Sequence, residues 1–414
     1  MASWAVSVSN PREVWLVTVA HGVNEFYSVA LPPILPLLVN DFSISYVEAG
    51  GLLTIFYAMY SVFQLPAGIL ADRIGQRWIL AAGMVTLSAG ILLAASAQEY
   101  RTLVMAEALA GVGGSTYHPS GMSLISDLET GDTEGKAMGI HGLGGIVGTA
   151  LAPALVGGVT ALFDWRVALT VSAMVGIIYG LIFLALFRDV DESNSTAVVE
   201  SEGRKTSEEE AKNNADTLIS PRSTLIAHIS VPLERWVAVL FLANLAIATE
   251  IGVVRTFVTS YLTEHAGMTT ALANGIFFIM LVGAGISSLG AGSLADFVDR
   301  RMLGFATMGA SAVGLAATVL IPLSPLMLFA WFFLLGIVMW APLPTMNAIT
   351  SQYSEQAFSG SLFGVMLTAG SLGGAGGPIL FGAGAEQFGL GVAFPLTASV
   401  SVVGAGAFLI LRSN

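Results

Sequence analysis

The chain has 414 residues, of which 55% are hydrophobic and only 11% are charged. Soluble domains carry about 25% charged residues, so this composition excludes a soluble globular protein and indicates a membrane protein. The absence of cysteine excludes disulfides and thiolate metal sites, and the formal charge of −12 indicates an acidic solvated surface.

Apolar segments of about 20 residues, enough to cross a ~30 Å hydrocarbon core as a helix, follow one another along the chain. We count twelve. The first six are expected at 14–38, 47–71, 78–97, 103–125, 137–162 and 164–187. The second six are expected at 236–262, 272–295, 303–321, 326–349, 358–385 and 392–411.

A polar segment at 188–233 separates these two sets of spans. It is rich in acidic residues and has few residues that could form a core, so it is predicted to be a disordered cytoplasmic linker. The chain is therefore divided into an N-terminal six-helix bundle at 1–187, the linker at 188–233 and a C-terminal six-helix bundle at 234–414.

The two sets of spans are copies of one unit. The turn GILADRIGQR at Gly68–Arg77 returns as GSLADFVDRR at Gly292–Arg301, a shift of 224 positions. Glu25 and Glu250 are related by almost the same shift, 225 positions. Since each copy has an even number of spans, both enter the membrane in the same sense, and a substrate path is expected at their interface.

Basic residues predict the orientation. With the N-terminus inside, 13 of the 16 Lys and Arg lie on the inner side, and only Arg101, Arg166 and Arg255 do not. The positive-inside rule therefore predicts a multi-pass protein of the cell membrane with both termini in the cytoplasm.

The turn at Gly68–Arg77 resembles the loop signature of the major facilitator superfamily. Three further stretches resemble its fosmidomycin-resistance-like exporters: His21-x-x-Asn24-Glu25-x-Tyr27, Tyr117-His118-Pro119-x-Gly121, and the glycine-rich run at 139–148. The resemblance implies an all-α membrane fold with twelve transmembrane helices in two pseudo-symmetric six-helix halves. It also implies a cytoplasmic gate, in which the acidic residue pairs with the start of the eleventh helix. The gate residues would be Gly68, Asp72, Arg73, Arg77, Asp296 and Arg301.

A glycine and proline pattern in the fifth span resembles the antiporter signature of that superfamily. Gly139, Gly148 and Pro153 fit it, whereas Ala152 and Val156 replace two of its glycines. The eleventh span carries a copy with Gly373, Gly377 and Pro378. Glycines let helices touch backbone to backbone and proline bends a span, so these residues would form a hinge surface between the halves. Ordinary tight helix packing is the alternative.

Ionisable residues inside spans cost roughly 2.5 to 3.5 kcal/mol on insertion scales, so they are expected to face a cavity and to have a function. The candidate substrate and proton pathway consists of His21, Asn24, Glu25, Glu107, His118, Glu250 and Arg255. We expect His21 to lie one turn from Glu25 on the same face. His141, in its glycine-rich setting, is expected to serve packing.

Roles within this set follow from charge and depth. Glu25, with His21 as a relay, or else Glu107 would exchange protons, and Arg255 would hold a second carboxylate or the substrate. Helix rise predicts that Glu107 and Arg255 meet across the interface. In the alternative, Glu250 and Arg255 form a structural ion pair and the histidines bond to neighbouring helices. Where many superfamily members carry an arginine, this chain has Glu107, so that arginine's role is not transferred.

No phosphate-binding loop, HExxH motif, other metal cluster or nucleophilic triad is recognisable. We therefore expect no enzyme activity, no cofactor, no metal and no nucleic-acid partner. The pattern favours a secondary transporter, working by alternating access as a monomer in the lipid bilayer, that exports a small organic molecule in exchange for protons. A proton-coupled importer of a carboxylate or other anion is the first alternative, and a non-transporting membrane sensor is the second.

Overall fold

The computed structural model describes residues 8–188, 235–295, 297–321, 323–353 and 359–411, and regular structure within these ranges is helical. Eleven helical segments in the described ranges are long and apolar enough to cross a membrane. A further crossing is made by two shorter consecutive helices, α5 (Tyr100–Gly114) and α6 (Tyr117–Leu128). The predicted all-α fold of twelve membrane-spanning helices is confirmed. The predicted linker at 188–233 lies outside the described residues, except for its first position.

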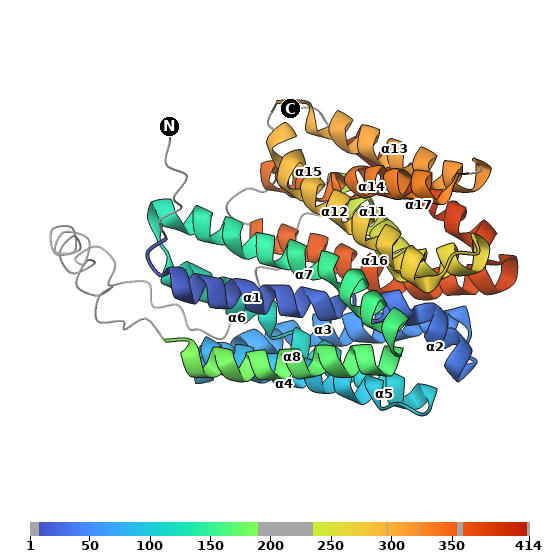
Figure 1. Ribbon diagram of the computed structural model, residues 1–414. Coiled ribbons are helices and arrows are strands. Elements are labelled where there is room, and N and C mark those ends of the chain that lie inside the picture. Colours follow the sequence, from blue (N-terminus) through green and yellow to red (C-terminus); the bar gives the residue numbers. More distant parts are fainter. Residues whose placement is uncertain (1–7, 189–234, 296, 322, 354–358, 412–414) are drawn as a thin grey trace, which may run out of the picture.

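The helices form two bundles that lie side by side, coloured blue to green and yellow to red in Figure 1. Besides α5 and α6, the first bundle comprises α1 (Pro11–Ser28), η1 (Pro32–Ile34), α2 (Leu35–Phe42), α3 (Tyr46–Ile74), α4 (Gln76–Ala95), η2 (Gly131–Thr133), α7 (Glu134–Leu162) and α8 (Trp165–Leu186). The second comprises α11 (Arg235–Ser260), η3 (Tyr261–His265), α12 (Thr270–Leu294), α13 (Arg300–Leu320), α14 (Pro325–Trp340), α15 (Pro342–Tyr353), α16 (Ser359–Phe388) and α17 (Leu390–Ile410).

Three crossings predicted as continuous helices are interrupted. Proline lacks a backbone N–H, so the first crossing breaks near Pro32 and the tenth before Pro342. The fourth crossing breaks at Ser115 and Thr116, whose hydroxyls donate to carbonyls three residues earlier at 2.6 and 3.0 Å. Such side-chain bonds compete with the helical ladder. The break places the start of α6 in the middle of the membrane.

Glycines bring α1 against α7 and α11 against α16 at backbone distance. A Cβ atom on Gly148 would lie 2.0 Å from the Gly22 carbonyl oxygen, and one on Gly373 would lie 2.5 Å from the Leu245 carbonyl oxygen. A Cβ on Gly377 would also meet α11, whereas one on Gly139 would meet nothing within 4 Å. Gly148, Gly373 and Gly377 therefore pack helices within each half, and a hinge surface between the halves stays a prediction for them.

The halves are joined at the end of the bundle where α2 lies, here called the α2 end. There the Val47 amide donates to Glu386 at 2.9 Å, and the Asn274 amide donates to the Pro33 carbonyl at 2.9 Å. A Cβ on Gly50 would lie 2.4 Å from the carbonyl oxygen of Pro378, so that part of the predicted hinge does touch the other half. Further bonds reach the middle of α3 and α16, where Ser61 and Ser371 lie 3.2 Å apart.

The arginines of the two loop signatures form hydrogen bonds within their own halves. Arg77 donates to the carbonyl of Leu184 near the end of α8, and Arg301 donates to the carbonyl of Leu411, just after α17, at 2.7 Å. Each arginine thus ties the start of one helix to the end of the last helix of its bundle. The pattern repeats because the unit repeats.

The acidic residues of the predicted gate have a different setting. Asp72 and Arg73 are exposed at the end of α3. Asp296, their counterpart in the second loop, lies outside the described residues, as do residues 354–358 just before α16. Gly68 packs its backbone against the Pro119 side chain, where a Cβ would lie 3.4 Å away. The gate contact with the eleventh helix therefore stays a prediction.

Candidate transport site

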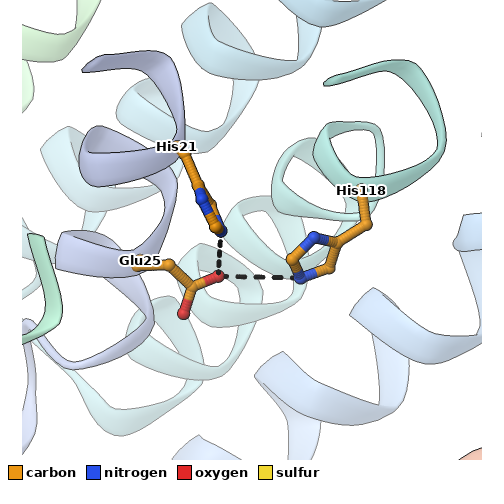
Figure 2. A group of neighbouring side chains, drawn as sticks. All are labelled: His21, Glu25 and His118. Atoms are coloured by element: carbon orange, nitrogen blue, oxygen red, sulfur yellow. Dashed lines mark ion pairs between the residues drawn. The ribbon is translucent and has the colours of Figure 1, made fainter. Parts of the chain in front are cut away.

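Three predicted pathway residues meet in the middle of the first half. His21 and Glu25 lie one turn apart on α1, and His118 lies at the start of α6, which the break in the fourth crossing places beside them. The Nε2 atoms of His21 and His118 are 3.9 and 3.7 Å from the same Glu25 carboxylate oxygen. Figure 2 shows the three side chains pointing toward one another. We call His21, Glu25 and His118 the triad.

The triad is accessible although it lies well inside the first and fourth crossings. The side chains of His21, Glu25 and His118 are 12%, 22% and 38% exposed, respectively. An ionisable group at this depth is expected to border a solvated path and not lipid.

The ring of His21 is held by two neighbouring rings. It stacks on Tyr117 with centroids 5.0 Å apart and on His141 with centroids 4.2 Å apart. A Cβ on Gly145 would lie 2.6 Å from the His21 ring, so this glycine makes room for it. His141 therefore packs, as expected from the sequence, but what it packs against is His21.

Hydrogen bonds also define which nitrogen of His21 carries a hydrogen. Its Nδ1 lies 2.8 Å from the carbonyl oxygen of His141, and because a carbonyl can only accept, Nδ1 is the donor. The lone pair of neutral His21 is therefore on Nε2, the atom that faces Glu25. Tyr117 donates to the Val17 carbonyl at 2.8 Å, so its oxygen accepts from His141 Nε2 at 2.9 Å.

Asn24 supports the carboxylate from the next position on α1. Its side-chain amide donates to Glu25 and to the Tyr60 hydroxyl, both at 3.2 Å, and the residue is 2% exposed. The ring of Tyr60 lies edge-on to His118 at 6.0 Å. Asn24 thus holds the Glu25 carboxylate in position, and its role in a pathway stays a prediction.

Arg255 and Glu107 do not meet, contrary to the expectation from helix rise. The Arg255 guanidinium donates to the Tyr57 hydroxyl of the other half and lies 5.2 Å from the centre of that ring. Glu107 is 2% exposed and one of its carboxylate oxygens has no hydrogen-bond partner in the described part of the chain. Tyr57 therefore occupies the position in which an ion pair was expected.

Glu250 lies inside the second bundle and not at the interface. It is 1% exposed and accepts from the Ser311 hydroxyl of α13, while its other carboxylate oxygen has no partner among the described residues. An ion pair with Arg255 is therefore excluded in this conformation. Although Glu250 is the repeat mate of Glu25, it belongs to a different site.

Part of this site follows from the sequence and part does not. The four-residue spacing of His21 and Glu25 predicted their proximity, and depth counting put His118 at a similar level. Tyr60 and the stacking of His141 were missed, because residues of α3 and α7 come next to α1 only in the folded bundle. The sequence also indicated no cluster of metal-ligand type, whereas the fold brings the triad's three ligand atoms within 4.8 Å of one another.

Two six-helix bundles that hold ionisable side chains within their membrane-spanning helices are typical of a multi-pass transporter. The Major Facilitator Superfamily profile matches residues 14–249 and 240–414, which together include almost the whole chain. The chain belongs to the major facilitator superfamily. It is thus a membrane transporter and not an enzyme.

Characterised relatives differ in what their names say they carry. The chain is 22% identical over 386 residues to a D-galactonate transporter of Escherichia coli, covering 90% of this chain and 88% of that protein. It is 30% identical over 139 residues to the fosmidomycin resistance protein of Escherichia coli, or 34% of each chain. A bacterial homolog of the human lysosomal transporter Spinster, solved in an inward-facing and occupied conformation, superimposes with a TM-score of 0.76 at 17% identity. That match covers 96% of this chain and 95% of the other and shows the fold.

Proposed function

We propose that this transporter works by alternating access and exports a small organic molecule or drug in exchange for protons. The observation that carries the proposal is the triad. A carboxylate without a Lys or Arg partner among the described residues lies between two imidazoles, partly exposed in mid-membrane. Glu25 would take up and release the proton, with His21, one turn away on the same helix face, as relay. Glu107 is the second candidate for this step.

The setting of Arg255 favours a substrate that carries an anionic group. None of the described carboxylates forms an ion pair with it, and its guanidinium is engaged with a neutral hydroxyl. A guanidinium presents a fork of donors that suits carboxylate or phosphate oxygens. We propose that the substrate's anionic end binds Arg255 and Tyr57, and that the rest of the molecule lies between the halves.

The proposed direction of substrate transport is export. The likeness to a fosmidomycin resistance protein and the glycine pattern of the fifth and eleventh spans support export. An importer of a sugar acid or other carboxylate is the competing candidate, because the likeness to a D-galactonate transporter extends over 90% of the chain and Arg255 would suit that substrate equally.

The topology is also proposed. Both termini would lie in the cytoplasm of a cell whose plasma membrane holds the protein, and one chain would contain a complete pathway. In that orientation the joined α2 end would face outside. This arrangement corresponds to an inward-facing conformation, the state of the superimposable Spinster homolog.

The test uses purified protein in sealed vesicles with an internal pH dye and a panel of small drugs and organic acids. Protons moving opposite to substrate support the exporter, and movement in the same direction supports the importer. Glu25→Gln should abolish proton movement but retain substrate-for-substrate exchange, whereas Glu99→Gln, at an exposed loop, should behave as the native chain does. Native proton coupling in Glu25→Gln removes Glu25 from the mechanism and shifts the role to Glu107, to be tested with Glu107→Gln.

A further inference from the structure

The triad has the composition of a metal site. Two imidazole nitrogens and one carboxylate oxygen face one another, and imidazole with carboxylate is a donor set that first-row divalent metals such as Zn²⁺ prefer. The donor spacings are also close to those required. With metal–ligand bonds of about 2.0–2.2 Å, donors around a tetrahedral ion lie about 3.3 Å apart. The two measured spacings to the Glu25 oxygen, 3.9 and 3.7 Å, exceed that value by about half an ångström.

These spacings are too long for direct hydrogen bonds between the three groups. The three side chains therefore do not satisfy one another's hydrogen-bonding capacity. A single ion between the three ligand atoms would contact all of them. The Glu25 carboxylate retains acceptor capacity for it, because Asn24 uses only part of the capacity of one oxygen.

A second observation points to the same ligand. In metal sites, a coordinating histidine almost always donates its other ring N–H to a carbonyl, carboxylate or water, which fixes the tautomer and aims the lone pair at the metal. His21 does this, since its Nδ1 donates to the His141 carbonyl and its Nε2 faces the triad. Stacking on Tyr117 and His141 holds the ring in that orientation.

We propose that His21, Glu25 and His118 form a binding site for one divalent transition-metal ion of the Zn²⁺ class. The ion would use the same lone pairs as a proton, so the two would compete. His118, the most exposed of the three, would be the ligand reached first from the solvated side. The inference rests on the geometry of the triad and holds whether or not the chain couples transport to protons.

The test is an equilibrium titration of the full-length protein, purified in detergent with a tag that contains no histidine. Co²⁺ is added near neutral pH while the visible d–d absorption of low-coordinate Co²⁺ is recorded, and Zn²⁺ is then added to displace it. We expect one Co²⁺ per chain. His118→Gln and Glu25→Gln should each weaken binding at least about tenfold. His265→Gln, which removes a histidine from η3 outside the triad, should leave the affinity unchanged.

One further variant tests the orientation of His21 without removing a ligand. Gly145→Ala would push a Cβ into the His21 ring, so it should also weaken Co²⁺ binding. Gel filtration and thermal unfolding establish that each variant is folded. Absence of Co²⁺ absorption with folded native protein, or equal affinity in native protein and His118→Gln, overturns the proposal. Because no gradient or substrate is used, failure here leaves the transport proposal standing, and failure of transport leaves this one standing.

Discussion

Replacing Gly148 by alanine should separate α1 from α7 and disturb the triad. The added Cβ would lie 2.0 Å from the Gly22 carbonyl oxygen and 2.6 Å from the Gly22 Cα, and atoms of that kind essentially never approach within 3.0 Å. Backbone cannot rotate away as a side chain does, so the two helices must move apart by about 1 Å at this point. Overpacking of this kind costs roughly 1–3 kcal/mol. Since α1 also carries His21 and Glu25, the same shift changes the spacing of the triad.

The assay has a matched control on the same helix. Gly139→Ala adds the same methyl group to α7 where nothing lies within 4 Å, and alanine favours a helix by about 1 kcal/mol relative to glycine. Thermal unfolding in detergent should therefore show a lower midpoint for Gly148→Ala and an equal or higher midpoint for Gly139→Ala. Transport in vesicles should fall only in Gly148→Ala. Equal midpoints and equal transport in the two variants would refute the close packing of α1 on α7.

Two other predictions concern the loops. Arg301→Gln loses a charge-assisted hydrogen bond to the Leu411 carbonyl and should lower the unfolding free energy of the second half by about 1–2 kcal/mol. Limited proteolysis should then cleave the chain earlier near α17. An unchanged cleavage pattern would contradict a stabilising role for this bond. Burial would raise the pKa of Glu129, but bonds from the backbone amides of Ser9 and Asn10 hold it below the ordinary 4.5. A depressed pKa contributes stability at higher pH that is lost as pH falls through it, so the protection of the Asn10 amide against hydrogen exchange, relative to its intrinsic rate, should fall there. Glu129→Gln should show weak protection of this amide at every pH.

Helix count and type were predictable from the sequence, whereas helix continuity was only partly so. Length and hydropathy determine a crossing, and the twelve predicted spans correspond to helical segments within a few residues. The break at Ser115 was missed because Ser and Thr inside an apolar span give no strong stop signal until their hydroxyls bond backward to carbonyls. That break determines where His118 lies, so the most informative feature of the site was the least visible in the sequence.

Charged residues show the same limit. Spacing along one helix predicted the contact of His21 with Glu25, since both lie on one face. Pairing between helices was predicted from depth alone, and it was wrong for Glu107 and Arg255. Depth places two residues in the same plane but leaves their rotation about each helix axis undetermined, and here a tyrosine of α3 takes the intervening position.

The contrast between Glu25 and Glu250 has a wider consequence. A glutamate occurs at matching positions of the two copies of the repeated unit. Glu25 is partly exposed, whereas Glu250 is buried within its own bundle and bonded to a serine. Duplication of the six-helix unit has therefore not produced two equivalent sites. We therefore expect substitutions around Glu25 to alter transport, and substitutions around Glu250 to alter the stability of the second half.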